Sequence, residues 1–155
     1  MPTPPISFTR SAHVPLAPSA ITDTIADVSQ WSRFEGYGPL PGIAEAVYEL
    51  RTDDMVDSRI RCTNTDGSTH TEEIYEWEPG ERIVLVLQDF SPPLSMIAAQ
   101  FVEEWELEAE GEGSRVVRRL DLHPKNALMW LPLWLISLLF RRAIAKQLRE
   151  MSEPT

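Results

Sequence analysis

Cysteine is almost absent from this chain of 155 residues, which contains only Cys62. A single cysteine excludes an intrachain disulfide and any zinc site that needs several cysteines. Histidine is also scarce, and His13, His70 and His123 form neither an HxH nor an HExxH pair, the spacings at which nearby histidines share a metal ion. We therefore expect three ordinary surface or strand-end histidines, no metal site and no cofactor.

Positively charged residues are also few. Lysine and arginine together number 14 against 24 aspartates and glutamates, which gives a formal net charge of −10. A surface this acidic disfavours nucleic-acid binding, because phosphates require basic side chains. The one basic cluster, from Arg141 to Arg149, lies near the C-terminus, where it suits the negative end of a helix dipole.

Long hydrophobic runs are missing as well. The first 13 residues, MPTPPISFTRSAH, lack the apolar core of a signal peptide, so we expect a cytoplasmic protein. The apolar run from Ala127 to Phe140 covers 14 residues, whereas a membrane span needs about 20. A buried helix is the simpler interpretation of this run.

That run opens the element around which the sequence is organised. Apolar residues recur at steps of three or four from Met129 to Met151, which predicts one C-terminal helix over residues 127–151. Proline is tolerated only near a first helical turn, so the regular helix is expected to start at Pro132, with residues 128–131 as a looser entry. Before Phe140 the opposite face is apolar too. Trp134, Leu135 and Leu138 would then be partly exposed and form a peripheral membrane contact or a homodimer contact.

The rest of the chain predicts a single α+β domain over residues 5–152, after a loose Pro-rich tail at residues 1–4. A helix follows Ser19, a short second helical turn covers residues 32–34, and a Gly- and Pro-rich loop covers residues 36–42. Alternating apolar and polar residues, with turn residues between them, predict about seven mostly antiparallel strands. The strands are expected at residues 7–13, 44–50, 56–62, 69–77, 82–90, 98–109 and 116–122.

Several segments together resemble the START/polyketide-cyclase superfamily (SRPBCC), which has the helix-grip fold. The segments are SAITDTIADVSQW, EGYGPLPGI, TNTDGSTHTEE, IYEWEPGERI, EEWELEAEGEGSRVVRRLDL and the closing helix. The resemblance implies a curved antiparallel sheet wrapped around a long C-terminal helix, with two short helices after the first strand. It also implies an internal apolar cavity that binds a sterol, lipid, polyketide, quinone or similar compound. It implies no single activity, because one cavity serves carriers and cyclases alike.

Strand alternation places Glu103 and Arg118 on the apolar side of two strands joined by the turn at residues 110–113. A buried charge must be paired, so we expect either a Glu103–Arg118 pair that orients the polar end of a ligand or a register slip that turns Arg118 outward. On the strand at residues 69–77, Tyr75 shares a side with Glu73, and His70 shares a side with Glu72. Glutamates on a strand usually face solvent, and the register decides which pair faces inward.

The resulting hypothesis is a binder of an apolar small molecule in a cavity between sheet and C-terminal helix, with the loop at residues 36–42 as its mouth. An enzyme of the cyclase or dehydratase type is one alternative, and docking through the C-terminal helix is the other. The expected cavity residues, beside Glu103 and Arg118, are Ala46, Tyr48, Ile60, Tyr75, Leu85, Trp105, Leu120, Leu133, Ile136 and Phe140.

Overall fold

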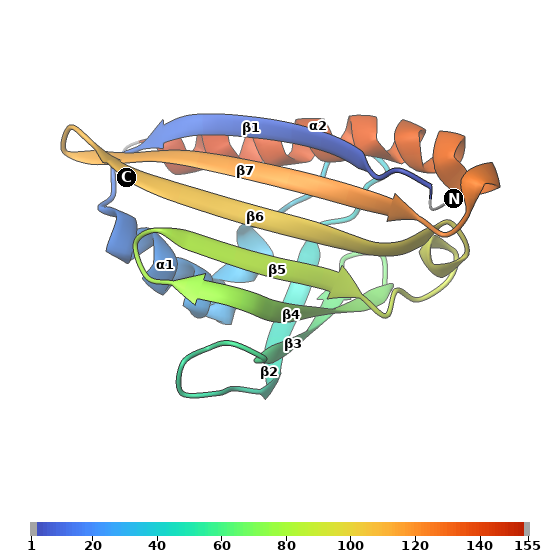
Figure 1. Ribbon diagram of the computed structural model, residues 1–155, viewed down its shortest axis with the longest axis horizontal. Helices are drawn as coiled ribbons and strands as arrows, with labels where there is room; N and C mark the ends of the chain where they lie inside the picture. Colours follow the sequence, from blue (N-terminus) through green and yellow to red (C-terminus); the bar gives the residue numbers. More distant parts are fainter. Residues whose placement is uncertain (1–2, 154–155) are drawn as a thin grey trace.

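The computed structural model describes residues 3–153 and contains one seven-stranded antiparallel sheet with a long C-terminal helix beside it (Figure 1). The predicted α+β architecture is therefore confirmed. Of the predicted tail, residues 1 and 2 lie outside the described residues, and residues 3–5 have no regular secondary structure. The elements are β1 (Ile6–Val14), α1 (Pro18–Ala26), η1 (Val28–Arg33), β2 (Ile43–Leu50), β3 (Arg59–Asn64), β4 (Thr69–Glu78), β5 (Arg82–Gln88), η2 (Leu94–Met96), β6 (Ala98–Glu110), β7 (Gly113–Pro124), η3 (Ala127–Met129) and α2 (Trp130–Ser152).

The strand order in the sheet is β1-β7-β6-β5-β4-β3-β2. Each strand from β2 to β7 therefore pairs with its neighbour in the sequence, whereas β1 pairs with β7 at the far end of the chain. Because the side chains of a strand alternate between two faces, every second residue of these strands points toward α2 and the short helices. The longest strands, β6 and β7, show this alternation of buried and exposed residues most clearly.

Three boundaries differ from the sequence-based expectation. The helix expected to continue from residue 20 to Trp31 ends at Ala26, because the side chain of Asp27 accepts a hydrogen bond from the Ser29 amide at 3.2 Å and caps a separate 3₁₀-helix. The third strand begins at Arg59 instead of residue 56, since Met55 and Asp57 adopt positive φ angles of 71° and 69° and turn the chain. Helix α2 begins at Trp130, which leaves Pro132 in the first turn, where no amide donor is needed.

Helix α2 has one buried face along most of its length. The buried residues are Leu133, Ser137, Phe140, Ala143, Ile144 and Leu148. The helix makes its main contacts with β1, at the edge of the sheet next to β7. Its C-terminal end reaches the same end of the molecule as α1 (Figure 1). Between that end and the middle of the sheet, the core contains a cavity.

Candidate functional site

The cavity has a volume of about 280 Å³. This is just below the range of about 300–1,000 Å³ for small-molecule sites. Its wall comes from the sheet, from α1 and η1, and from the C-terminal half of α2. The apolar lining residues are Ile25, Trp31, Phe34, Leu40, Pro41, Ile43, Leu85, Leu87, Phe90, Leu94, Phe101, Trp105, Leu120, Phe140, Ile144 and Met151.

The loop at residues 36–42 contributes Leu40 and Pro41 to this lining. Its shape depends on Gly36, which has a φ angle of +76° and whose Cβ, if it had one, would lie 2.2 Å from the carbonyl oxygen of Leu40. Only glycine combines that backbone angle with so close an approach. Reciprocal hydrogen bonds between Tyr37 and Leu40, of 3.0 and 2.9 Å, then close the turn beside the cavity.

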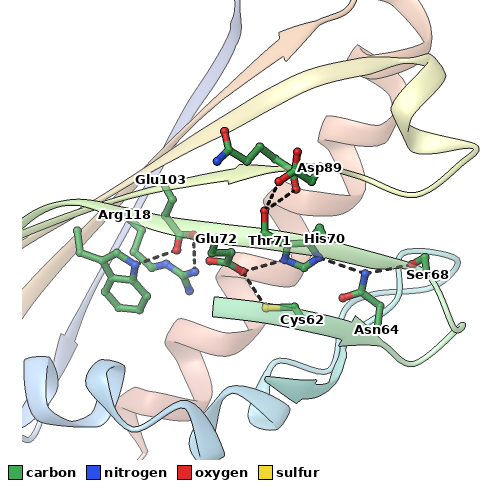
Figure 2. A network of polar contacts seen from close by, with 11 residues as sticks. Cys62, Asn64, Ser68, His70, Thr71, Glu72, Asp89, Glu103 and Arg118 are labelled. Carbon is green, nitrogen blue, oxygen red and sulfur yellow. Dashed lines mark hydrogen bonds and ion pairs between the residues drawn. The ribbon is translucent and has the colours of Figure 1, made fainter. Parts of the chain in front are cut away.

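One polar group on the wall is the pair predicted from the sequence. The Arg118 guanidinium donates to Glu103 at 2.7 Å, and Glu103 also accepts from the Trp105 indole at 2.9 Å. Both residues of the pair are buried, so of the two alternatives that the sequence left open, the inward Glu103–Arg118 pair is the one that the structure shows. Arg118 also stacks over the Trp105 ring and donates to Gln147 of α2, while its Nε finds no partner in residues 3–153. Figure 2 shows the pair together with a second polar group.

That second group lies on β3 and β4, where Cys62 is paired across the strands with His70. Glu72 accepts from the Cys62 thiol at 3.6 Å, and its distance to His70 Nε2 is 2.9 Å. The other ring nitrogen of His70 meets the amide of Asn64 at 3.3 Å, and that amide donates to Ser68 at 3.0 Å (Figure 2). Burial, with the nearby Glu72 carboxylate as the second cause, strongly raises the pKa of the Cys62 thiol, which is therefore protonated.

These positions correct two expectations. His70 is buried and faces the cavity, so it is no surface histidine, and Glu72 is buried instead of facing solvent. The inward side of β4 therefore carries His70, Glu72 and Ile74, which puts Tyr75 on the opposite side. A bulge between Ile74 and Glu76 leaves Tyr75 without a partner on β5, and its side chain is 52% exposed. Tyr75 thus lies off the cavity.

The structure places six of the expected cavity residues on the cavity wall. They are Leu85, Glu103, Trp105, Arg118, Leu120 and Phe140. Leu133 and Ile136 lie off it, because they belong to the half of α2 before Phe140 and the cavity lies under the half that follows. Ala46, Tyr48 and Ile60 also lie off it: η1 packs against β2, and Tyr48 donates to the carbonyl oxygen of Ala26 at 2.7 Å. Whether the six contact a ligand stays a prediction.

Sequence reasoning missed part of the wall for two reasons. Ile144, Gln147 and Met151 follow Phe140 at helical spacing and could have been found from that spacing alone. Trp31, Phe34 and the polar residues His70 and Glu72 required the packing of η1 and the register of β4, which the sequence leaves open.

The model of the family described as polyketide cyclase/dehydrase and lipid transport matches residues 5–153. No curated protein matches the chain. Among solved structures, the TTHA0849 protein of Thermus thermophilus is similar with a TM-score of 0.71 and 16% identity, over 95% of this chain and 94% of that one. The major latex-like protein 151 of Panax ginseng gives 0.67 and 12%, over 98% and 100%. The protein Ara h 8.0201 gives 0.62 and 14%, over 94% and 99%. These similarities establish the helix-grip fold.

Proposed function

Because the chain belongs to the polyketide cyclase/dehydrase and lipid transport family of the SRPBCC superfamily, we propose that it binds one apolar small molecule in the cavity between the sheet and the C-terminal half of α2. The observation that carries the proposal is the cavity itself, whose wall is mostly apolar and includes two buried polar groups, His70 with Glu72 and Glu103 with Arg118. Ligand sites combine these features, since apolar walls supply affinity and a few polar atoms fix orientation.

The Glu103–Arg118 pair favours a particular kind of ligand. Arg118 is already neutralised by Glu103, so a carboxylate on the ligand would add an uncompensated buried charge. A neutral oxygen, such as a carbonyl or hydroxyl group, adds none. It would also relieve the unpartnered Nε of Arg118, since a buried donor without a partner costs about 1–3 kcal/mol. We therefore expect a largely apolar molecule with at least one uncharged oxygen.

Filling the cavity tests this proposal. The half-buried Leu87 of β5 lines the cavity between Glu72 and Phe101, and Leu87→Trp would occupy part of the space. The variant should bind 6-propionyl-2-(dimethylamino)naphthalene, an uncharged fluorescent ketone, at least tenfold more weakly than the wild type, a loss of about 1.4 kcal/mol. Fluorescence titration measures this affinity, and native mass spectrometry of gently purified protein shows whether a lipophilic molecule is retained.

The matched control adds the same side chain on the other face. Tyr75→Trp replaces the exposed aromatic residue at the β4 bulge and should leave probe affinity unchanged. Equal probe binding by wild type and Leu87→Trp, together with a ligand-free mass from several preparations, would contradict the proposal.

A second candidate function rests on a separate surface. Four leucines at spacings of three and four form one exposed face along η3 and α2, here called the leucine face: Leu128, Leu131, Leu135 and Leu138, with exposed fractions of 83, 59, 54 and 38%. Trp134 is half-buried and packs on the core instead. The exposed basic residues Lys125 and Arg142 flank the leucine face in a chain of net charge −10.

We propose that this face lies on an anionic membrane surface. By length and composition alone, Ala127–Ser152 would also be long enough to cross a membrane, with a mean hydropathy of 1.5 over its most apolar window, but the buried side of α2 belongs to the protein core. Apolar side chains flanked by lysine or arginine are typical of helices that lie in the interface.

The membrane proposal predicts that Leu131→Glu/Leu135→Glu lowers binding to phosphatidylserine-containing vesicles at least tenfold in co-sedimentation, because two buried leucines contribute about 3–6 kcal/mol. Val47→Glu alters a comparably exposed residue of β2, 45% exposed, and should have no effect. Absence of vesicle binding, combined with a wild-type dimer in analytical ultracentrifugation that the double variant abolishes, would assign the face to a second copy of the chain and overturn the membrane proposal.

A further inference from the structure

Three different metal-binding groups, from Cys62, His70 and Glu72, lie together beside the cavity, and His70 and Glu72 line its wall. One ligand atom from each residue lies within 4.8 Å of the other two, and all three side chains are buried. The group is built by the β3–β4 hairpin: Cys62 and His70 face each other across the strands, and Glu72 follows His70 on the same side. The sequence hides this arrangement, because the cysteine and the histidine come from different strands.

The spacing fits a tetrahedral ion. With metal–ligand distances of about 2.0 Å for nitrogen and oxygen and 2.3 Å for sulfur, tetrahedral geometry requires about 3.3 Å between nitrogen and oxygen ligands and about 3.5 Å between sulfur and oxygen ligands. The structure has 2.9 Å between His70 Nε2 and Glu72 Oε2, and 3.6 Å between Cys62 Sγ and that same oxygen. All three ligand atoms lie within 4.8 Å of one another, so side-chain movements of about 1 Å would accommodate the ion.

Charge provides a second and independent argument. The chain buries two carboxylates on the cavity wall, and Glu103 is compensated by the permanent positive charge of Arg118. Glu72, by contrast, makes its hydrogen bonds within residues 3–153 to a thiol and an imidazole, neither of which carries a permanent charge. Because a buried charge requires compensation, a cation at this position would do for Glu72 what Arg118 does for Glu103.

The surroundings of His70 also suit a metal ligand. A histidine that binds a metal through one ring nitrogen usually donates its other N–H to an acceptor that fixes the ring. Asn64 lies 3.3 Å from Nδ1 of His70 and is itself held by Ser68. The amide nitrogen that faces His70 is the one that donates to Ser68, whose hydroxyl donates to Asp66. Asn64 would therefore offer its oxygen to His70 after a half-turn of the amide, with the Ser68 hydroxyl turning its proton from Asp66 to that oxygen.

We propose that Cys62, His70 and Glu72 bind one divalent transition-metal ion of the zinc class, with a free coordination position at the cavity. Thiolate, imidazole and carboxylate together are the donor set that zinc takes, and three protein ligands leave one position open. His70 and Glu72 also line the cavity, which puts that position within reach of an oxygen on a bound molecule. Such an ion polarises a carbonyl or acidifies a bound water.

Metal binding has to remove the proton from the Cys62 thiol, because the thiolate is the ligand. Burial and Glu72 raise the pKa of this thiol, so the ion has to displace its proton at neutral pH as well as in acid. Binding should therefore release protons, and affinity should rise with pH. The ion would replace the hydrogen bonds that Glu72 now accepts.

Cobalt(II) is the probe for the test, because it takes zinc sites and its thiolate complexes absorb in the near ultraviolet. Tag-free protein stripped with a chelator should bind one equivalent of Co²⁺, develop the thiolate charge-transfer band and the visible bands of a tetrahedral ion, and lose both on addition of Zn²⁺. Cys62→Ser should abolish the charge-transfer band. Asn64→Ala, which removes the positioning amide, should weaken binding about 10–100-fold.

The exposed His13–Glu110 pair, 3.2 Å apart, provides the control, and His13→Gln should leave the spectrum unchanged. X-ray absorption of the zinc-loaded wild type needs no variant and should show one sulfur ligand at about 2.3 Å. A coordination shell without sulfur, or a cobalt spectrum that depends on His13 and not on Cys62, would overturn the proposal. Metal and probe binding are measured separately, so either proposal can fail without the other.

Discussion

Glu103→Leu should destabilise the protein by about 3–5 kcal/mol, which we expect to be among the largest effects of any single substitution in the chain. The change leaves the Arg118 guanidinium buried without its carboxylate partner, and arginine cannot shed its charge. Arg118 would keep its hydrogen bond to Gln147 and its contact with the Trp105 ring, neither of which neutralises it. Equilibrium unfolding in urea, followed by circular dichroism, measures the loss.

A second variant separates charge from packing. Glu103→Leu/Arg118→Met removes both charges and should recover most of the lost stability, since an apolar replacement of a whole buried pair is often nearly neutral. Glu104→Leu alters the next residue of β6, whose ion pair with Arg82 at 3.2 Å is partly exposed, and should cost about 1 kcal/mol or less. Equal losses from Glu103→Leu and Glu104→Leu would show that the inner pair is not electrostatically important.

Phe101→Ala should cost about 3–5 kcal/mol, as expected for removal of a fully buried phenylalanine. The Phe101 ring lies 4.7 Å from Phe90 and 5.3 Å from Phe140 between ring centres, so it connects β6 to the segment after β5 and to α2. Losing it removes both aromatic contacts, each of which adds about 0.5–1.5 kcal/mol. Urea unfolding again measures the change.

This substitution should act in opposite directions on stability and on cavity size. Phe101 lines the cavity, so the alanine variant should enlarge it and accept bulkier apolar probes than the wild type does. Tyr75→Ala, an aromatic truncation on the outer face, should cost no more than about 1 kcal/mol and leave probe selection unchanged. A variant that is as stable as the wild type would show that the three rings do not hold α2 to the sheet.

The difference between Glu103 and Tyr75 shows what the sequence could predict. Glu103 and Arg118 lie on long strands joined by a short turn, so counting in twos from the turn places both correctly. On β4 the alternation also holds from His70 to Tyr75, but it does not tell which of the two sides faces inward, and the structure buries the side of His70, Glu72 and Ile74. Alternation sorts residues onto two faces of a strand, and the neighbouring elements decide which face is buried.

The sequence predicts an apolar cavity against α2, but it places that cavity partly beside the wrong half of the helix. The apolar face of α2 is readable from its spacing, but the spacing does not tell which half of the helix lies close to the sheet. The position of the cavity along α2 depends on the contact of α2 with β1 and on the packing of α1 and η1 near the C-terminal half of α2. Both are tertiary contacts, which the helical spacing does not predict. For the same reason the sequence alone does not reveal the Cys62–His70–Glu72 group, because these residues meet only through the register of the β3–β4 hairpin.

The pairing of β1 with β7 has a consequence for the order of events during synthesis. β1 is the first of the seven strands of this sheet to be made, yet its partner Gly113–Pro124 is made about a hundred residues later. Until then β1 has no strand beside it, while β2 to β6 can already pair with their neighbours in turn. Closing so long a loop is slow. We therefore expect β1 to be the last of the seven strands to join the sheet, with α2, which follows all of them in the sequence, packing against it.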